Sequence, residues 1–84
     1  MTALEQIEQH RILWGLALPH LPTPDPQIVV RWVEYPLQSV EHAILRTAKR
    51  FTREKVGSDF DPNQAYRFVT GTARQISKQA RPVR

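Results

Sequence analysis

Four prolines within eight residues constrain the fold of this chain more than any other feature. Residues 19–26 read PHLPTPDP. Each proline ring removes a backbone N–H donor and pushes the preceding residue toward extended geometry. We therefore expect a stiff connector at 19–26, which separates an N-terminal helix from the rest of the chain.

The residues before this connector predict a first helix over 2–16. Thr2 and Glu5 have the spacing of a capping box, in which each side chain bonds the backbone N–H of the other residue. From Ile12 to Leu18 every residue is apolar or glycine. At 100° per residue these side chains point all round the helix, so its second half needs burial on several sides.

The second helix is predicted over 26–35, because Asp25 and Pro26 suit the N-cap and N1 positions and Pro36 ends the helix before it. The third, over 39–55, has the most regular pattern in the chain. Its apolar stripe consists of Val40, Ala43, Ile44, Thr47, Ala48 and Phe51.

The fourth helix is predicted over 62–79, with Asp61 as its cap and Pro62 at its first position. Its inner stripe consists of Ala65, Phe68, Val69, Thr72, Ala73 and Ile76. A basic tail follows at 80–84. The sequence therefore predicts one all-α domain over 1–84, with four helices around a single core.

The length and the absence of cysteine narrow the class of protein further. A chain of 84 residues builds one small core. Without cysteine it has no disulfide and no thiolate metal site. The apolar run before Pro19 is far shorter than the roughly 20 residues that cross a membrane. We expect no membrane association and a cytoplasmic location.

Charge is distributed unevenly along the chain. Residues 1–45 hold two basic and five acidic residues, a net charge of −3, whereas residues 46–84 hold ten basic and three acidic residues, a net charge of +7. Helical-wheel spacing gathers four of these cations on the outer side of the third helix and four on the outer side of the fourth. They are Arg46, Lys49, Arg50 and Arg53, followed by Arg67, Arg74, Lys78 and Arg81.

Such faces are often simply solvated, but the fourth helix carries no acid after Asp61 to balance its cations. Repulsion between such unpaired cations is better tolerated where a bound polyanion neutralises their charge. The leading hypothesis is a nucleic-acid-binding or nucleic-acid-associated accessory domain that contacts phosphates. Because the cations follow the first turn of the third helix, little base reading is expected.

The residue types that could support catalysis or bind a metal are present, but they are not arranged for either role. His10, His20 and His42 pair with no other histidine or carboxylate at a ligand spacing. The serines lie in no nucleophile elbow, and the glycines are too far apart to cradle a phosphate. We therefore predict no enzyme activity, no metal site and no cofactor.

The alternative hypothesis is a protein-interaction or assembly module. Its contact surface would be the apolar stretch 12–18 together with Leu45, which lies off the inner stripe of the third helix. Because a four-helix core cannot cover this stretch from one side, we expect a symmetric homodimer with Leu13 and Leu16 at its centre.

Overall fold

The computed structural model describes residues 2–79, and helices make up most of them. The elements are α1 (Ala3–Ala17), α2 (Pro26–Val29), the 3-10 helix η1 (Trp32–Glu34), α3 (Leu37–Arg50) and α4 (Pro62–Gln79). Residues 2–79 contain no strand. The prediction of a small all-α domain is therefore confirmed, while the basic tail at 80–84 lies outside the described residues.

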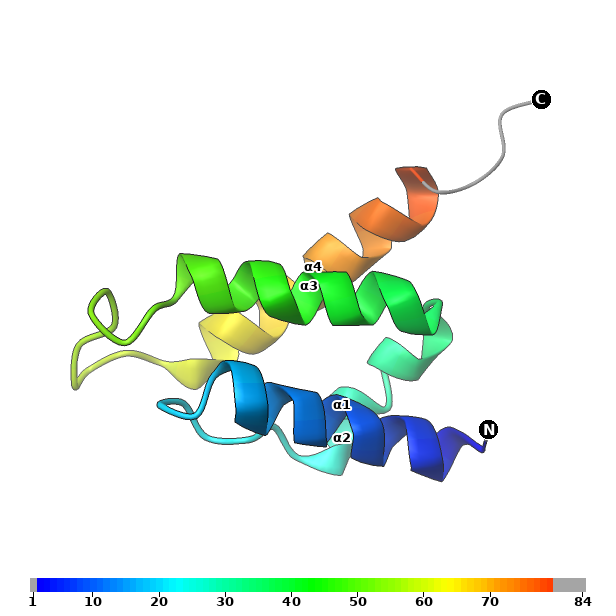
Figure 1. The fold of residues 1–84 in the computed structure, drawn as a ribbon, viewed down its shortest axis with the longest axis horizontal. Coiled ribbons are helices and arrows are strands. Elements are labelled where there is room, and N and C mark those ends of the chain that lie inside the picture. Colours follow the sequence, from blue (N-terminus) through cyan, green and yellow to red (C-terminus); the bar gives the residue numbers. More distant parts are fainter. Residues whose placement is uncertain (1, 80–84) are drawn as a thin grey trace.

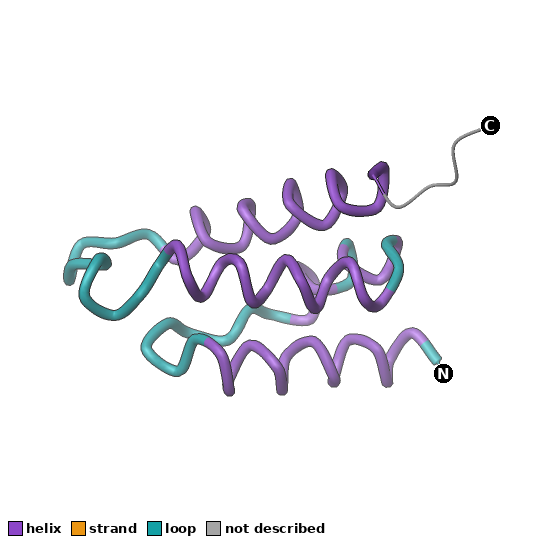
Figure 2. Tube along the Cα trace, turned by 45° about the horizontal axis from the view of Figure 1, so that its top comes forward, coloured by secondary structure: helices purple, strands orange, loops and turns teal. Residues whose placement is uncertain are grey.

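The three long helices form the body of the molecule. In Figure 1, α1 and α3 lie side by side and run in the same direction, whereas α4 lies against α3 and runs the opposite way. Figure 2 shows the same order from a second angle, with α3 between α1 and α4. The short α2 and η1 cover the end of the bundle where α3 begins. As a result α3 contacts both of the other long helices.

The capping box expected at the start of α1 is present. The Thr2 N–H donates to Glu5 Oε1 at 2.9 Å, and the Glu5 N–H donates to Thr2 Oγ1 at 3.2 Å. The hydrogen bonds from Thr2 stabilise the Glu5 carboxylate and hold its pKa below the usual value. Local sequence alone therefore determines where α1 begins.

The proline-rich connector is attached to both neighbouring parts of the fold. The Arg11 Nε of α1 donates to the carbonyl of Pro24 at 3.1 Å. From the other side, the Tyr66 hydroxyl of α4 donates to the carbonyl of Pro22 at 2.7 Å. Leu21 and Pro24 are buried between these anchors. Proline stiffness and two long-range hydrogen bonds thus fix the path from α1 to α2.

The predicted continuous second helix over 26–35 was wrong, because α2 ends at Val29 and the backbone tightens into η1. Short-range bonds replace the α-helical ones: the Arg31 N–H donates to Ile28 O, and the Tyr35 N–H donates to Trp32 O. This path buries Trp32 completely, and its Nε1 donates to Thr70 Oγ1 of α4 at 3.0 Å. Burial of one indole against α4 overrides the helical propensity of the segment.

The third helix also differs from its prediction, because it ends at Arg50 and not near residue 55. Phe51 leaves the helical region, with φ −110° and ψ 60°. Its carbonyl lies 2.7 Å from His20 Nε2, which donates the hydrogen bond since a carbonyl only accepts. Its ring packs against those of Phe60 and Phe68 at centroid distances of 5.2 and 5.6 Å. These contacts take the place of further helical turns.

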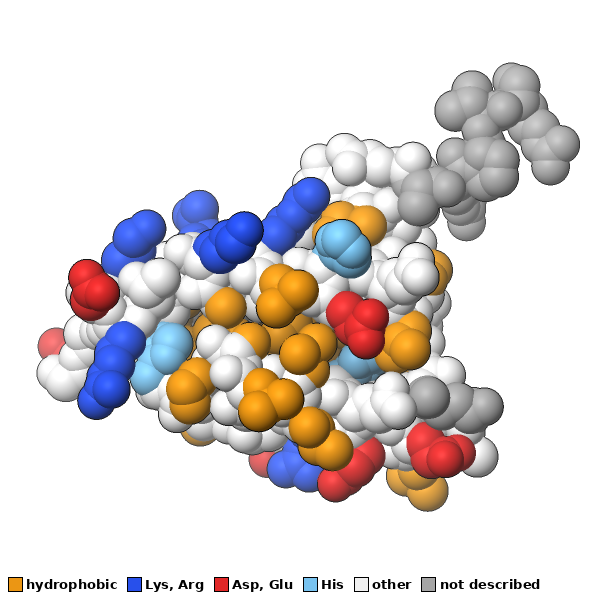
Figure 3. Space-filling view, viewed as in Figure 1, with side chains coloured by type: hydrophobic (Ala, Val, Ile, Leu, Met, Phe, Trp, Pro, Cys, Tyr) orange, Lys and Arg blue, Asp and Glu red, His pale blue; other side chains and the backbone are white. Residues whose placement is uncertain are grey.

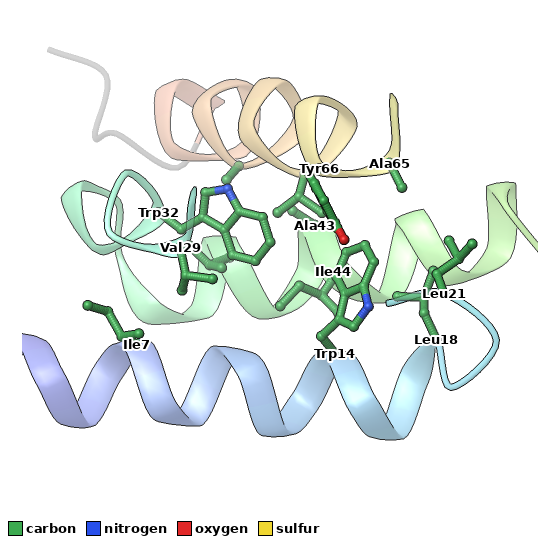
Figure 4. Packing of buried hydrophobic residues seen from close by; sticks show 13 residues of the cluster. Ile7, Trp14, Leu18, Leu21, Val29, Trp32, Ala43, Ile44, Ala65 and Tyr66 are labelled. Carbon is green, nitrogen blue, oxygen red and sulfur yellow. The ribbon is translucent and has the colours of Figure 1, made fainter. Parts of the chain in front are cut away.

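Aromatic residues from three elements fill the core (Figure 4). The Trp14 ring centroid lies 6.2 Å from that of Trp32 and 5.2 Å from that of Tyr66. Both tryptophans are fully buried. Aliphatic side chains from every long helix surround them, among them Leu18, Ile44 and Val69. This core fixes the rotation of each helix and therefore the side chains that each one exposes.

Candidate nucleic-acid interface

The outward side of α3 carries a row of exposed cations. Burial of Val40, Ala43, Ile44 and Thr47 on one side of the helix turns the opposite side to solvent. Arg46, Lys49 and Arg50 lie there, and all three are exposed. Together with Arg53, which follows the end of the helix, we call these residues the α3 row.

Two members of the α3 row have additional contacts. The Arg50 guanidinium lies over the rings of Phe51 and Phe68, at 5.7 and 5.2 Å from their centroids, which orients it between α3 and α4. Arg53 is not on the helix as predicted but in the following turn. There it lines a cavity of about 500 Å³ together with Pro19, His20, Val56, Gly57 and Ser58.

The cations of α4 form a second and separate surface. Arg67, Arg74 and Lys78 are exposed on the side of α4 away from its buried stripe. The uncharged exposed residues Gln64, Gly71 and Gln75 occupy the strip of the helix surface between these cations and Phe68, which faces Arg50. The predicted Arg81 lies outside the described residues. The structure therefore keeps the α4 cations apart from the α3 row.

Arg31 joins the α4 cations, although the sequence analysis did not single it out. It lines a cavity of about 340 Å³ together with Arg67, Asn63 and Asp61. Arg31 belongs to the acidic half of the chain, and it lies near α4 because the next residue, Trp32, is hydrogen-bonded to Thr70 of that helix. No local sequence signal predicts this contact.

The charges are distributed unevenly on the surface. Figure 3 shows lysine and arginine side chains gathered over α3, and acidic side chains both toward the N-terminal ends of α1 and α3 and at the opposite end, in the loop that follows α3. Within residues 2–79, no carboxylate oxygen lies within 4.0 Å of a side-chain nitrogen of the α3 row. The row is thus not neutralised by ion pairs with the described part of the chain.

The three histidines occupy different environments. His10 is buried against Trp32, its Nε2 has no hydrogen-bond partner, and desolvation lowers its pKa although nearby Glu41 acts in the opposite direction. His20 is bonded to the end of α3, and His42 is exposed beside the α3 row. Among residues 2–79, no three side chains of the metal-ligating types gather at one place.

The predicted dimer residues also differ from one another. Leu13 is half-buried and packs against the core, whereas Leu16 is 76% exposed. Ile12 and Leu45 are exposed as well, at 58% and 49%. The predicted dimer itself stays a prediction: Leu16 faces solvent, whereas Leu13, the other residue placed at its centre, is half-buried.

No helix within residues 2–79 is both long enough and apolar enough to cross a membrane. Comparison of the chain with protein families, with curated proteins and with solved structures gives no match.

Proposed function

We propose that this domain binds nucleic acid through contacts between the α3 row and backbone phosphates. The observation that carries the proposal is the α3 row itself, whose exposed cations follow one another along α3 and the turn after it and have no carboxylate oxygen within 4.0 Å among residues 2–79. Three of its four members are arginine, whose planar guanidinium bonds phosphate oxygens bidentately. The domain is a binding module and not an enzyme.

The position of the cations along α3 favours phosphate contact over base reading. A recognition helix reads bases mainly with its N-terminal residues. The first turns of α3 present Gln38 and Glu41, and the cations begin at Arg46. In addition, α2 has four residues, too few for the first helix of a helix-turn-helix. We therefore expect binding that depends little on nucleotide sequence.

Titration of a short fluorescent DNA duplex and an RNA of equal length over a range of salt concentrations tests the proposal. Log affinity for the DNA should fall linearly with log salt, with a slope near −0.9 for each phosphate contacted. The paired substitutions Arg46→Gln and Arg53→Gln should weaken binding and make the slope shallower by about 0.9 for each lost contact.

The matched control is the pair Arg74→Gln and Lys78→Gln, which removes the same net charge from exposed positions of α4. The α3 pair should weaken binding more than the α4 pair. Equal effects would mean that net charge alone attracts the polyanion. Absence of binding at low salt would refute the proposed function altogether.

One observation favours a second function, as an assembly module. Leu16, Ile12 and Leu45 expose apolar side chains on neighbouring helices. Lys49, one turn beyond Leu45, lies where this surface meets the α3 row. In a dimer that engages Lys49, phosphate contact would fall to Arg46, Arg50 and Arg53.

A further inference from the structure

A continuous apolar surface lies across α1 and α3. We call it the apolar face and define it by Ile12, Leu13 and Leu16 of α1 and Leu45 of α3. Ile12 and Leu16 are one helical turn apart, and Leu13 packs against the core between them and α3. In Figure 3, hydrophobic side chains form one patch that extends from α3 down to α1.

This patch is more than a set of scattered surface residues. The exposed fractions of its three outermost side chains are 76% for Leu16, 58% for Ile12 and 49% for Leu45. The other large apolar side chains exposed within residues 2–79 are Leu4 and Val30, on other parts of the surface. Monomeric proteins rarely leave a large contiguous apolar patch in water, so the apolar face favours a partner.

The charges around the apolar face indicate which partner fits. Because α1 and α3 run in the same direction, their N-terminal ends lie at one end of the face and the C-terminal end of α3 lies at the other. Glu5, Glu8 and Glu41 lie at the N-terminal end. Lys49 lies one turn beyond Leu45, at the opposite end. The face therefore changes from acidic to basic along its length.

We propose that the apolar face binds a second copy of this chain, with the helices of the two copies antiparallel across a two-fold axis. In that arrangement Leu16, Ile12 and Leu45 of one copy meet the same residues of the other. At each end, Lys49 of one copy faces the N-terminal part of α3 of the other, which carries Glu41. The same charge pairing thus occurs twice.

Charge complementarity is the reason to choose a second copy over another protein. A partner of uniform charge would be attracted to one end of the face and repelled at the other. An antiparallel copy matches both ends at once. Burial of apolar surface supplies most of the affinity, whereas pairing of exposed charges mainly determines orientation. A two-fold axis parallel to the helices would place α1 of one copy opposite α3 of the other in the same direction, so that acids would face acids at one end and Lys49 would face no acid at the other.

Sedimentation equilibrium of the full chain tests the existence of the dimer. The wild type should be dimeric at concentrations of about 100 µM, and Leu16→Glu should raise the dissociation constant at least about tenfold, because it buries a charge in the contact. Leu4→Glu is the matched control, since Leu4 lies on the same helix and is 77% exposed but lies off the apolar face. It should change the dissociation constant by less than about twofold.

Charge reversal tests the antiparallel orientation. Lys49→Glu and Glu41→Lys should each weaken the dimer, and the double variant should recover most of the affinity. With the axis parallel to the helices, Lys49 has no acid opposite it, so the double variant would recover nothing. Circular dichroism confirms that each variant is folded. A monomeric wild type, or equal effects of Leu16→Glu and Leu4→Glu in folded variants, overturns the proposal.

Discussion

The helices α1 and α3 are neighbours that run in the same direction, yet their outward sides differ in kind. Helix α3 separates buried apolar residues from exposed cations, so its outward side is well solvated as it stands. Helix α1 buries Ile7, His10 and Trp14 but also exposes Ile12 and Leu16. Helix α3 lies between α1 and α4 and exposes Leu45 beside its cations, whereas α1 keeps more apolar surface, at Ile12 and Leu16, that its neighbours do not cover.

This difference separates two kinds of partner. The outward side of α3 offers charge, which attracts a polyanion and weakens with salt. The outward side of α1 offers apolar area, which binds through exclusion of water and is much less sensitive to salt. The two helices thus present two surfaces, and a change in salt concentration distinguishes binding at one surface from binding at the other.

The largest expected difference is between substitutions on the buried and exposed sides of α1. Replacement of Trp14 by alanine should destabilise the fold by about 3–5 kcal/mol, because the indole is fully buried against Trp32 and Tyr66. Replacement of Leu16 by alanine should change the free energy of unfolding of the monomer by less than about 0.5 kcal/mol. Urea denaturation at a protein concentration well below that of dimer formation measures both values. A large loss for Leu16→Ala would show that this side chain is covered within one chain.

A smaller effect compares the buried histidine of α1 with the exposed histidine of α3. Burial lowers the pKa of His10 in the folded state, so the unfolded chain binds the proton more readily. The contribution of neutral His10 to stability is therefore complete above the unfolded pKa of about 6.5 and is lost as the pH falls below it. Glu41 on α3 opposes this loss, and Trp32 packs against the ring without a charge.

Urea denaturation at several values between about pH 7.5 and pH 5.5 measures this dependence. His10→Gln should remove part of it, whatever its effect on stability at neutral pH. His42→Gln, which makes the same substitution at an exposed position, is the matched control. If the free energy of unfolding changed equally with pH in the wild type and in His10→Gln, the assignment of the effect to His10 would be contradicted.

The sequence predicts features that depend on local spacing. The capping box of α1, the start of α4 at Pro62 and the exposure of Arg46, Lys49 and Arg50 each depend on residues within a few turns of one another. Helical periodicity is enough to determine them.

Features that depend on residues far apart in the chain could not be predicted. The end of α3 at Arg50 involves His20, which is 31 residues from Phe51. The break between α2 and η1 accompanies burial of Trp32 and its bond to Thr70, which is 38 residues away. The separation of the α4 cations from the α3 row depends on how two helices are rotated against each other. Wheel positions on single helices contain no information about that rotation.

The smallest expected effect concerns Gly71, which lies within α4 on the uncharged strip beside the cations. Apart from the adjoining residues and the backbone of the helix itself, no heavy atom lies within 4 Å of the position that a Cβ would occupy there, so alanine fits without displacing a neighbour. Gly71→Ala should therefore stabilise the fold by about 0.5–1 kcal/mol, because alanine restricts the unfolded chain and favours the helix. Gly57→Ala is the control, since this position has equal space but lies in the loop before α4, where no helix propensity is gained. Thermal denaturation compares the two variants with the wild type. An unchanged or lower stability for Gly71→Ala would show that this side of α4 is not open to solvent, and it would place an unrecognised contact beside Arg74 and Lys78.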